Sequence, residues 1–359
     1  MSWPGPGTDT DTDTDTDTGN VDSMNSVSTE DDASTHAYAA LQPNDILAAL
    51  EDIGFHCNGR FLALNSYENR VYQVGIEDGA SVVAKFYRPG RWTDAAILEE
   101  HQFTEELAAR DIPVVPPMRI DGETLHRYGP FRLSVSPCHG GRAPDLDNSE
   151  LQQQIGRLIG RIHLHGETAD FEHRPTIDLE GFGYESQEFL LEHEFIPQEL
   201  EEVYSGITQH LFDGIEASFD RAGSVRQIRL HGDFHPGNVL VNELQLHIVD
   251  FDDARTGPAV QDLWMFLSGD RHEQAPQLDN LLEGYQEFRP FDARELHLIE
   301  ALRTLRIMHY AAWIARRWDD PAFKAAFPWF NSPRYWDEHI LTLREQAALM
   351  EEEPLYWQG

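Results

Sequence analysis

The chain has 359 residues, of which 40% are hydrophobic and 11% aromatic, so it is long enough to form two lobes with ample core. Its formal net charge of −36 argues against nucleic acid and anionic lipid as partners, because a strongly acidic surface repels both. The sequence has no run of eighteen apolar residues, no signal-peptide pattern, and only Cys57 and Cys138, without metal-like spacing. We therefore expect a cytoplasmic protein that does not enter a membrane.

Residues 1–41 are predicted to form a disordered acidic tail. They include five consecutive Asp-Thr pairs between residues 8 and 18, and residues 1–40 contain nine acidic residues and no Lys or Arg. Such a segment cannot bury enough apolar surface to become ordered. The remainder of the chain is also acidic, which we interpret as a solubility or salt adaptation. Attraction of cationic substrates is the alternative interpretation.

Residues 42–138 are predicted to form a small lobe with an antiparallel sheet and one main helix. A short first helix is expected to be capped by Asn44. The following β-type and helical patterns give a β-β-β-α-β-β order, which is typical of an α+β fold. The strand-like runs and the helix between them occupy residues 61–77 and 81–89, then 93–111 for the helix, and 114–137.

Residues 139–359 are predicted to form a larger and mostly helical lobe. Residues 149–166 have a strong amphipathic pattern, and a long helical run covers residues 292–320. Asp292 and Glu295 have the spacing of a capping box at the start of that run. One isolated β-hairpin is expected to interrupt the helices, starting near residue 228.

The expected hairpin lies in residues 230–254, LHGDFHPGNVLVNELQLHIVDFDDA, which are rich in histidine and acidic side chains. A strand that leaves Asn238 and a returning strand that ends at Asp250 bring these two residues to one end of the hairpin. Their oxygen atoms are ligands that suit Mg²⁺, and Asp233, slightly apart, is free to accept a proton from a hydroxyl group. A transition-metal site is the weaker alternative, because no HExxH or Cys/His spacing is present.

The order H-x-D-x-x-x-x-N, followed by a strand-borne D-F-x, is the phosphoryl-transfer pattern of kinase-like folds. Here it runs from His231 to Asn238 and continues with Asp250, Phe251 and Asp252. Asp252 replaces the usual glycine, and Gly232 replaces the usual arginine. Both departures point away from eukaryotic-type protein kinases and toward the aminoglycoside phosphotransferase and choline kinase branch.

A kinase-like fold also requires a lysine on the third strand and a glutamate on the next helix. Lys85 is one of only two lysines in the chain, and it lies in the apolar run VVAKF. We expect its ammonium group to bind the phosphates of ATP. Glu100 shares a helix face with Phe103 and Leu107, so Glu100 rather than Glu99 is predicted to pair with Lys85.

The loop expected to cover the phosphates, residues 65–69, has no GxGxxG motif. Its backbone N–H groups and the Ser66 hydroxyl can bind phosphate as a glycine loop does, and an ordinary polar turn is the alternative. Further along the chain, Asp262 is either a helix cap or a buried acid that braces the catalytic loop. Asp253 and Arg255 are interpreted as structural.

Six segments of the sequence together resemble the bacterial stress response kinase A family, over about residues 42 to 350. They are LNSYENRVYQ, VAKFYRPGRW, ILEEHQF, RLHGDFHPGN, DDARTGPAVQDLWM and ARRWDDPAF. The resemblance implies a bilobal protein-kinase-like fold and a cytoplasmic, monomeric kinase that uses ATP and Mg²⁺. It also implies phosphorylation of serine and threonine residues of proteins, in the response to envelope and oxidative stress.

By the same resemblance, Asp233 is the proton acceptor, and Asn238 and Asp250 are magnesium ligands. Asp250 is also catalytic, and Ser66 contacts ATP. Two other functions remain open from the residues: a small-molecule kinase for aminoglycosides, choline or homoserine, and a pseudokinase-like binding module. The complete catalytic set argues against the binding module, and the resemblance favours protein over small-molecule substrates.

Overall fold

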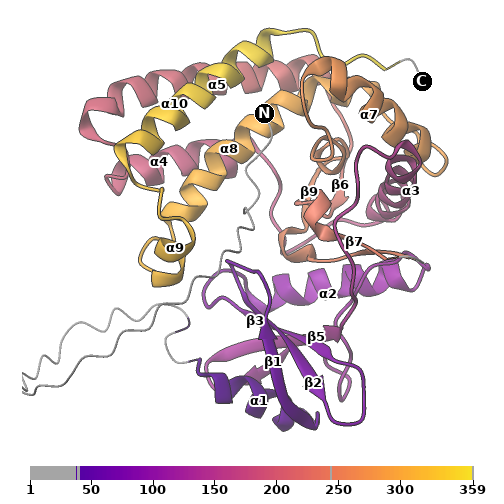
Figure 1. Ribbon diagram of the computed structural model, residues 1–359. Helices are drawn as coiled ribbons and strands as arrows, with labels where there is room; N and C mark the ends of the chain where they lie inside the picture. Colours follow the sequence, from indigo (N-terminus) through magenta and orange to yellow (C-terminus); the bar gives the residue numbers. More distant parts are fainter. Residues whose placement is uncertain (1–37, 39–40, 243–244, 358–359) are drawn as a thin grey trace, which may run out of the picture.

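The computed structural model describes residues 38, 41–242 and 245–357, which form two lobes (Figure 1). The N-terminal lobe is built on one sheet whose five strands are all antiparallel, in the order β1-β2-β3-β5-β4. Its elements are α1 (Pro43–Asp52), β1 (Cys57–Ala63), β2 (Arg70–Ile76), β3 (Val82–Tyr87), α2 (Asp94–Ala108), β4 (His126–Tyr128) and β5 (Phe131–Pro137). The predicted β-β-β-α-β-β order and the α+β class are confirmed.

Helix α1 and Tyr38 pack against the sheet of the N-terminal lobe. The backbone N–H of Gln42 donates to the carboxylate of Asp45 (2.8 Å), so the helix begins at Pro43 and the predicted cap at Asn44 is wrong. Tyr38 is only 4% exposed, and its hydroxyl donates to the backbone oxygen of Phe86 (2.9 Å). Tyr38, which belongs to the predicted tail, is therefore packed against this lobe. Residues 1–37 and 39–40 of that tail lie outside the described residues.

The C-terminal lobe is mostly helical, and it contains two small sheets on the side that faces the N-terminal lobe (Figure 1). Its helices are α3 (Ser149–Gly166), α4 (Glu185–Glu192), α5 (Glu201–Ala222), α6 (Gln261–Trp264), α7 (Arg271–Tyr285), α8 (Ile299–Ala315), α9 (Pro321–Ala326) and α10 (Pro333–Glu351). Short 3₁₀ or π turns occur at η1 (Glu180–Tyr184), η2 (Gln198–Leu200), η3 (Pro236–Asn238), η4 (Phe251–Asp253) and η5 (Ala293–Leu298).

The two small sheets differ from the single hairpin that the sequence predicts. Strands β7 (Val239–Val241) and β8 (Leu246–Ile248) form the expected hairpin. Strand β6 (Gln227–Leu230) instead pairs antiparallel with β9 (Arg255–Pro258), which follows the hairpin in the chain. The second sheet therefore encloses the hairpin, and it brings the two ends of the 230–254 segment together.

The long helical run of the C-terminal lobe begins differently from the prediction. Asp292 accepts the backbone N–H of Arg294 (3.1 Å), as a cap should, but the first turns are the 3₁₀ segment η5. Glu295 does not close a capping box, because its carboxylate is 1% exposed and accepts the N–H of Val260 (2.8 Å). Burial raises the pKa of Glu295 to about 7.

Helices α3 and α7 pack with their backbones unusually close. A Cβ atom added to Gly156 would lie 2.0 Å from the carbonyl oxygen of Leu281, and one added to Gly160 would lie 2.6 Å from that of Tyr285. Any larger side chain at either position would have to push the helices apart. Glycine is therefore required at this contact, and the core around it also contains Phe234 and Phe251.

Helix α2 joins the two lobes, although it belongs to the first by sequence. Its side chains Phe103 and Leu107 are fully buried in the same core as Phe251 of the C-terminal lobe. The rings of Phe103 and Phe251 meet edge to face, with centroids 6.0 Å apart. The helix is therefore fixed against the segment that follows β8.

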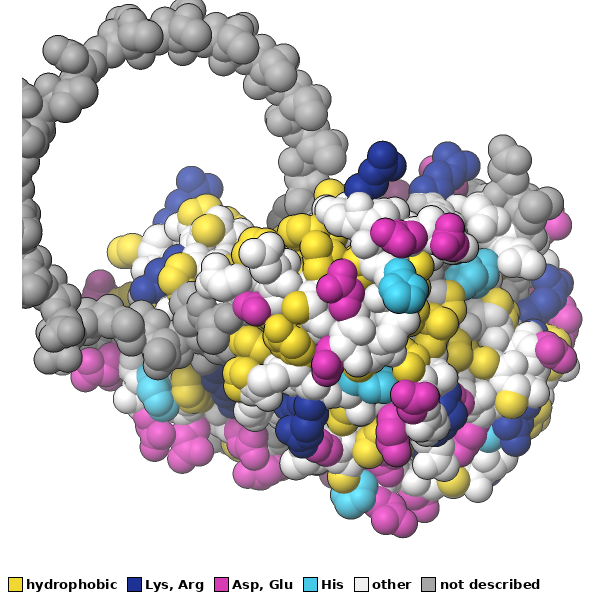
Figure 2. All heavy atoms as spheres, turned by 90° about the horizontal axis from the view of Figure 1, so that it is seen from below, with side chains coloured by type: hydrophobic (Ala, Val, Ile, Leu, Met, Phe, Trp, Pro, Cys, Tyr) yellow, Lys and Arg dark blue, Asp and Glu magenta, His cyan; other side chains and the backbone are white. Residues whose placement is uncertain are grey.

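The surface carries acidic groups on many sides. Figure 2 shows Asp and Glu side chains spread over the face seen from below rather than gathered in one patch. Among the described residues, no helix is long and apolar enough to cross a lipid bilayer.

Candidate active site

Residues 231–238, which the sequence predicts to be the catalytic segment, lie between β6 and β7 and are held in place by buried hydrogen bonds. The side chain of Asp262 is fully buried and accepts the backbone N–H groups of His231 and Gly232, both at 2.9 Å. The ring of His231 stacks on Phe234 and bonds the backbone oxygen of Val249 (2.9 Å). Of the two alternatives for Asp262, the structure therefore supports the buried acid that braces the loop.

Gly232 explains why this segment lacks the arginine of eukaryotic-type kinases. Its φ angle is +83°, and an added Cβ would lie 2.2 Å from the carbonyl oxygen of Asp253. Both the backbone conformation and the close approach therefore exclude any residue with a side chain. The replacement follows from tight packing between the catalytic loop and the 250–253 segment.

Asp233 lies beside a basic residue that the sequence reasoning missed. Its Oδ1 atom forms an ion pair with Nη1 of Arg306 on α8 at 2.5 Å, and its Oδ2 atom lies 3.7 Å from Nε2 of His235. The Asp233 side chain is 25% exposed, so a hydroxyl group can reach it from solvent. Arg306 is 73 residues distant in sequence and lies in a helix with no motif, so no sequence signal indicates this contact.

The hairpin brings Asn238 and Asp250 to the same end, as predicted. The backbone N–H of Val249 donates to the carbonyl oxygen of Asn238 (3.0 Å), which fixes the two strands in register there. The Asn238 amide nitrogen donates to the backbone oxygen of Asp233 (2.9 Å), which leaves the amide oxygen for another ligand. Asp250 adopts a left-handed backbone (φ +63°), and its side chain is 54% exposed.

One amide oxygen and one accessible carboxylate fit Mg²⁺, which is commonly held by one or two protein oxygens together with water and substrate phosphates. No group of three or more His, Cys, Asp or Glu side chains that could hold a metal by itself occurs in the described part of the chain. The chemistry of the donors therefore suits a cation that arrives with a phosphate ligand.

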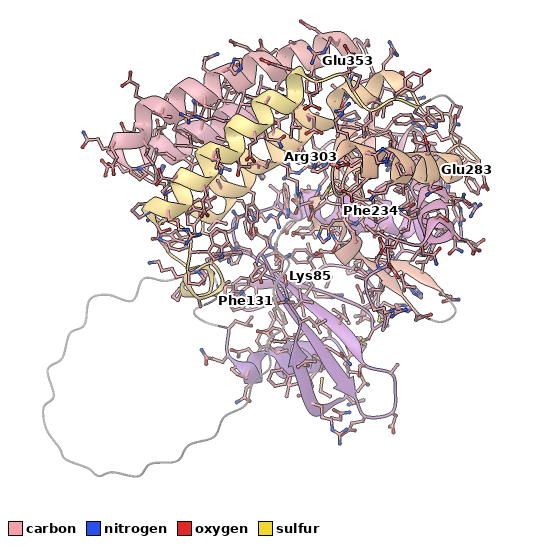
Figure 3. All side chains as sticks on the ribbon, turned by 45° about the horizontal axis from the view of Figure 1, so that its top comes forward. Lys85, Phe131, Phe234, Glu283, Arg303 and Glu353 are labelled. Atoms are coloured by element: carbon pink, nitrogen blue, oxygen red, sulfur yellow. The ribbon has the colours of Figure 1, made fainter. Side chains whose placement is uncertain are left out.

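Lys85 projects from β3 to this same end of the hairpin. Figure 3 shows Lys85 at the junction of the two lobes, with Phe234 labelled in the C-terminal lobe. Its Nζ atom lies 3.2 Å from Oδ1 of Asp250 and 3.0 Å from Oδ1 of Asp252. Burial alone would lower the pKa of Lys85, but the nearby carboxylates outweigh it and raise that pKa well above its ordinary value.

The two glutamates on α2 have different surroundings. Glu100 is 5% exposed and faces the same core as Phe103, as expected. In the described chain, however, Lys85 forms ion pairs with Asp250 and Asp252 and not with Glu100. Burial raises the pKa of Glu100 to about 7, although Lys85 opposes this. Glu99 turns the other way and accepts the backbone N–H groups of residues 172–174 at 2.6, 2.9 and 2.9 Å.

Asp252 is nearly enclosed, at 4% exposed. Besides Lys85, its carboxylate contacts Arg91, and its backbone oxygen accepts from the guanidinium of Arg174. Burial would raise the pKa of Asp252, but Lys85 and Arg91 hold it at about 2. Asp253 pairs with Arg91 at 2.7 Å, which supports its interpretation as structural.

The loop between β1 and β2 is tied to the C-terminal lobe by Glu68. The Glu68 carboxylate pairs with Arg317 (2.7 Å) and accepts from Nε1 of Trp313 (2.5 Å), and it also meets Arg88 (3.1 Å) of its own lobe. Arg88 in turn pairs with Asp320 (2.7 Å). We call these five residues the interlobe clamp.

Sequence reasoning missed the interlobe clamp, although Glu68, Arg88, Arg317 and Asp320 all lie in segments that carry the family resemblance. The predicted ATP contact, Ser66, lies two residues before Glu68. Its side chain is partly exposed, and no hydrogen bond of it is recorded in the described structure. The clamp fixes the position of its loop.

These features match a known family. Residues 60–299 match the phosphotransferase enzyme family, and these residues include Lys85, the catalytic segment and the hairpin. The chain is 42% identical to stress response kinase A of Escherichia coli strain K12 over 322 residues, which cover 90% of this chain and 97% of that protein. The chain belongs to the stress response kinase A family. This confirms the family assignment made from the sequence motifs, and the protein is a phosphotransferase.

Other relatives extend the likeness in two directions. The serine/threonine protein kinase RdoA of Salmonella typhimurium is 40% identical over 318 residues, covering 89% of this chain and 96% of that protein. A solved structure of amicoumacin kinase hAmiN in complex with AMP-PNP, Ca²⁺ and Ami has a TM-score of 0.67 at 17% identity, covering 86% of this chain and 94% of that one. A microcompartment-associated aminopropanol kinase has a TM-score of 0.64 at 18% identity, with 85% and 96% covered. The two structures share the kinase-like fold of this chain.

Proposed function

We propose that this phosphotransferase is a cytoplasmic, monomeric kinase that uses ATP and Mg²⁺ to phosphorylate serine and threonine residues of proteins during envelope and oxidative stress. The observation that carries the proposal is the meeting of Asp233, Asn238, Asp250 and Lys85 at one end of the β7–β8 hairpin. The stress role and the protein substrates rest on the names of the close relatives.

In this proposal, each residue has one role in transfer of the γ-phosphoryl group. Asp233 accepts the proton of the acceptor hydroxyl as its oxygen forms a bond to phosphorus and the bond to ADP breaks. Asn238 and Asp250 hold Mg²⁺, which when bound neutralises charge on the phosphate oxygens. Lys85 binds the phosphates, and the backbone N–H groups and Ser66 of the loop at residues 65–69 cover them.

The rival function is a small-molecule phosphotransferase, because the solved neighbours with this fold include an aminopropanol kinase. Arg306 argues against an amine-bearing acceptor. Its guanidinium lies 2.5 Å from Asp233, so a cationic group next to the reacting hydroxyl would meet a positive charge. This local repulsion opposes the long-range attraction of cations by the acidic surface.

The deciding experiment offers both substrate classes to one preparation of enzyme. The full chain is incubated with γ-labelled ATP and Mg²⁺, with generic protein substrates in one set of reactions and a panel of aminoalcohols and aminoglycosides in the other. We expect label to enter protein on serine and threonine. Rapid labelling of an aminoalcohol with none in protein would establish the rival function instead.

Asp250→Ala tests the metal assignment within the same assay. Removing this carboxylate should raise the Mg²⁺ concentration needed for half-maximal rate and lower the rate itself, because one of the side chains that would hold the metal is lost. Asn238→Ala should act in the same direction. An unchanged Mg²⁺ titration in both variants would show that the metal binds elsewhere.

A further inference from the structure

Lys85 has a partner that the kinase pattern does not provide. In that pattern, a glutamate on the helix after the third strand holds the lysine. Here the closest carboxylate to Lys85 is that of Asp252, at 3.0 Å, in the position where the usual motif has glycine. We propose that Asp252 is the positioning residue that holds Lys85 toward the ATP phosphates, in place of Glu100. The role of Lys85 in this statement rests on the proposed kinase function.

Asp252, rather than Asp250, is the stable one of the two partners. Asp250 accepts a hydrogen bond from Lys85 at 3.2 Å, but its side chain is 54% exposed, and in the proposed function its carboxylate would also have to hold Mg²⁺. The side chain of Asp252 is 6% exposed and is held on its other side by Arg91. A buried carboxylate between two cations keeps its position, because any movement would leave a buried charge unpaired.

Glu100 is unsuited to this task in the structure. No ion pair within 4.0 Å joins Glu100 to Lys85 in the described chain. Its Oε2 atom and Oδ1 of Asp252 are both buried without a hydrogen bond, but only the Asp252 atom contacts the ammonium of Lys85, at 3.0 Å. Helix α2 is also fixed by the burial of Phe103 and Leu107 in the shared core, so a simple swing of the helix toward Lys85 would disrupt that core. Glu100 therefore contributes only a weaker, more distant field.

The geometry has a consequence for how the site assembles. In the usual arrangement the lysine and its glutamate both belong to the N-terminal lobe. Here Lys85 belongs to β3 while Asp252 belongs to η4 of the C-terminal lobe, next to the metal-binding Asp250. Alignment of the lysine therefore depends on contact between the lobes.

The chain offers a direct test because Lys85 and Lys324 are its only lysines. The full chain is treated with an amine-acylating reagent at one pH, and modification of each lysine is followed by peptide mass spectrometry. In wild type, Lys85 should react slowly because its ammonium is enclosed between two carboxylates, and Lys324 provides the internal reference. Asp252→Asn should raise the ratio of Lys85 to Lys324 labelling by about tenfold, the change expected when a buried ion-pair partner is lost.

Glu100→Gln should change the labelling ratio less than about threefold, because Glu100 forms no direct pair with Lys85. Glu105→Gln on the same helix is the matched control, since Glu105 pairs with Arg119 at the surface. Asp252→Glu keeps the charge and should return the ratio toward wild type. A ratio that rises in Glu100→Gln and stays constant in Asp252→Asn would overturn the proposal.

Two further measurements keep the result interpretable. Asp252→Asn should raise the KM for ATP about tenfold, and Asp252→Glu should recover part of the loss. If Asp252→Asn does not fold, the labelling of Glu100→Gln decides, because a large increase there would assign the lysine to Glu100. Labelling is independent of turnover, so the expected labelling in an enzyme that phosphorylates no protein would leave the pairing standing and refute the protein substrate.

Discussion

Glu68→Gln should loosen the contact between the two lobes without unfolding either one. The substitution removes the charge from a side chain that is 10% exposed and that faces three arginines. Arg88 keeps Asp320, and Arg91 keeps its aspartates, but Arg317 loses its only recorded carboxylate partner in the described chain. The net loss is therefore that of one buried ion pair rather than three.

Breaking one buried pair by removing a single partner costs about 3 to 5 kcal/mol. We take the lower end, about 3 kcal/mol, because the amide of glutamine can still accept from Trp313, and this corresponds to about a 100-fold change in an equilibrium constant. The N-terminal sheet and the helical lobe each retain a core that Glu68 does not enter. The loss should therefore appear in lobe closure.

The assay combines the KM for ATP with the radius of gyration from small-angle X-ray scattering. We expect a larger radius and a KM raised at least tenfold, with the far-ultraviolet circular dichroism unchanged. Glu338→Gln, which breaks an exposed pair with Arg334, is the control and should change neither quantity. In a double-mutant cycle with Arg317→Met, strictly additive effects and an unchanged radius would refute the clamp.

Three other substitutions test separate parts of the structure. Asp233→Asn should lower kcat by about 100-fold or more while ATP affinity stays within about threefold, because a proton acceptor acts mainly on the chemical step; isothermal titration and initial rates measure both. Gly160→Ala should cost about 1 to 3 kcal/mol by forcing α3 from α7, whereas Gly206→Ala, with nothing within 4 Å, should not destabilise; urea unfolding compares them. Glu295 binds its proton more tightly in the folded than in the unfolded state, so its contribution to the free energy of unfolding is lost as the pH rises toward about 7. Glu295→Gln should therefore remove a change in the free energy of unfolding on the order of 3 kcal/mol between pH 5 and 7.5.

The elements that the sequence predicts well are those whose signal is local. The amphipathic pattern of residues 149–166 corresponds to α3 without a shift at either end. The helix expected in residues 93–111 is α2, and the side chain of Thr93 caps it by accepting the backbone N–H of Ala96. The sequence also predicts that Asn238 and Asp250 lie at one end of the hairpin. The structure agrees, because a short two-stranded ladder fixes where each strand begins and ends. Local periodicity and turn chemistry are sufficient for such features.

The errors concern side chains whose partner is distant in sequence. Glu295 has the spacing of a capping box, but its carboxylate instead accepts the backbone N–H of Val260, the residue just before α6. The sequence also does not predict that Glu99 accepts the backbone N–H groups of residues 172–174. Glu68 pairs with Arg317 across the two lobes, and Arg306 of α8 pairs with Asp233. No periodicity or spacing in the sequence indicates either contact. Charge partners in a folded protein are selected by tertiary packing, which local patterns do not contain.

The short segment of chain between Asp250 and Asp262 has a consequence for regulation. Only eleven residues separate them, and η4 and β9 occupy seven of these. Protein kinases that are switched by phosphorylation use a long loop at this point, which becomes ordered when arginines bind the phosphate. Here the segment is already folded, and the residue before Asp233 is Gly232 rather than the arginine of that motif. We therefore expect that phosphorylation does not switch this enzyme by ordering the segment between Asp250 and Asp262.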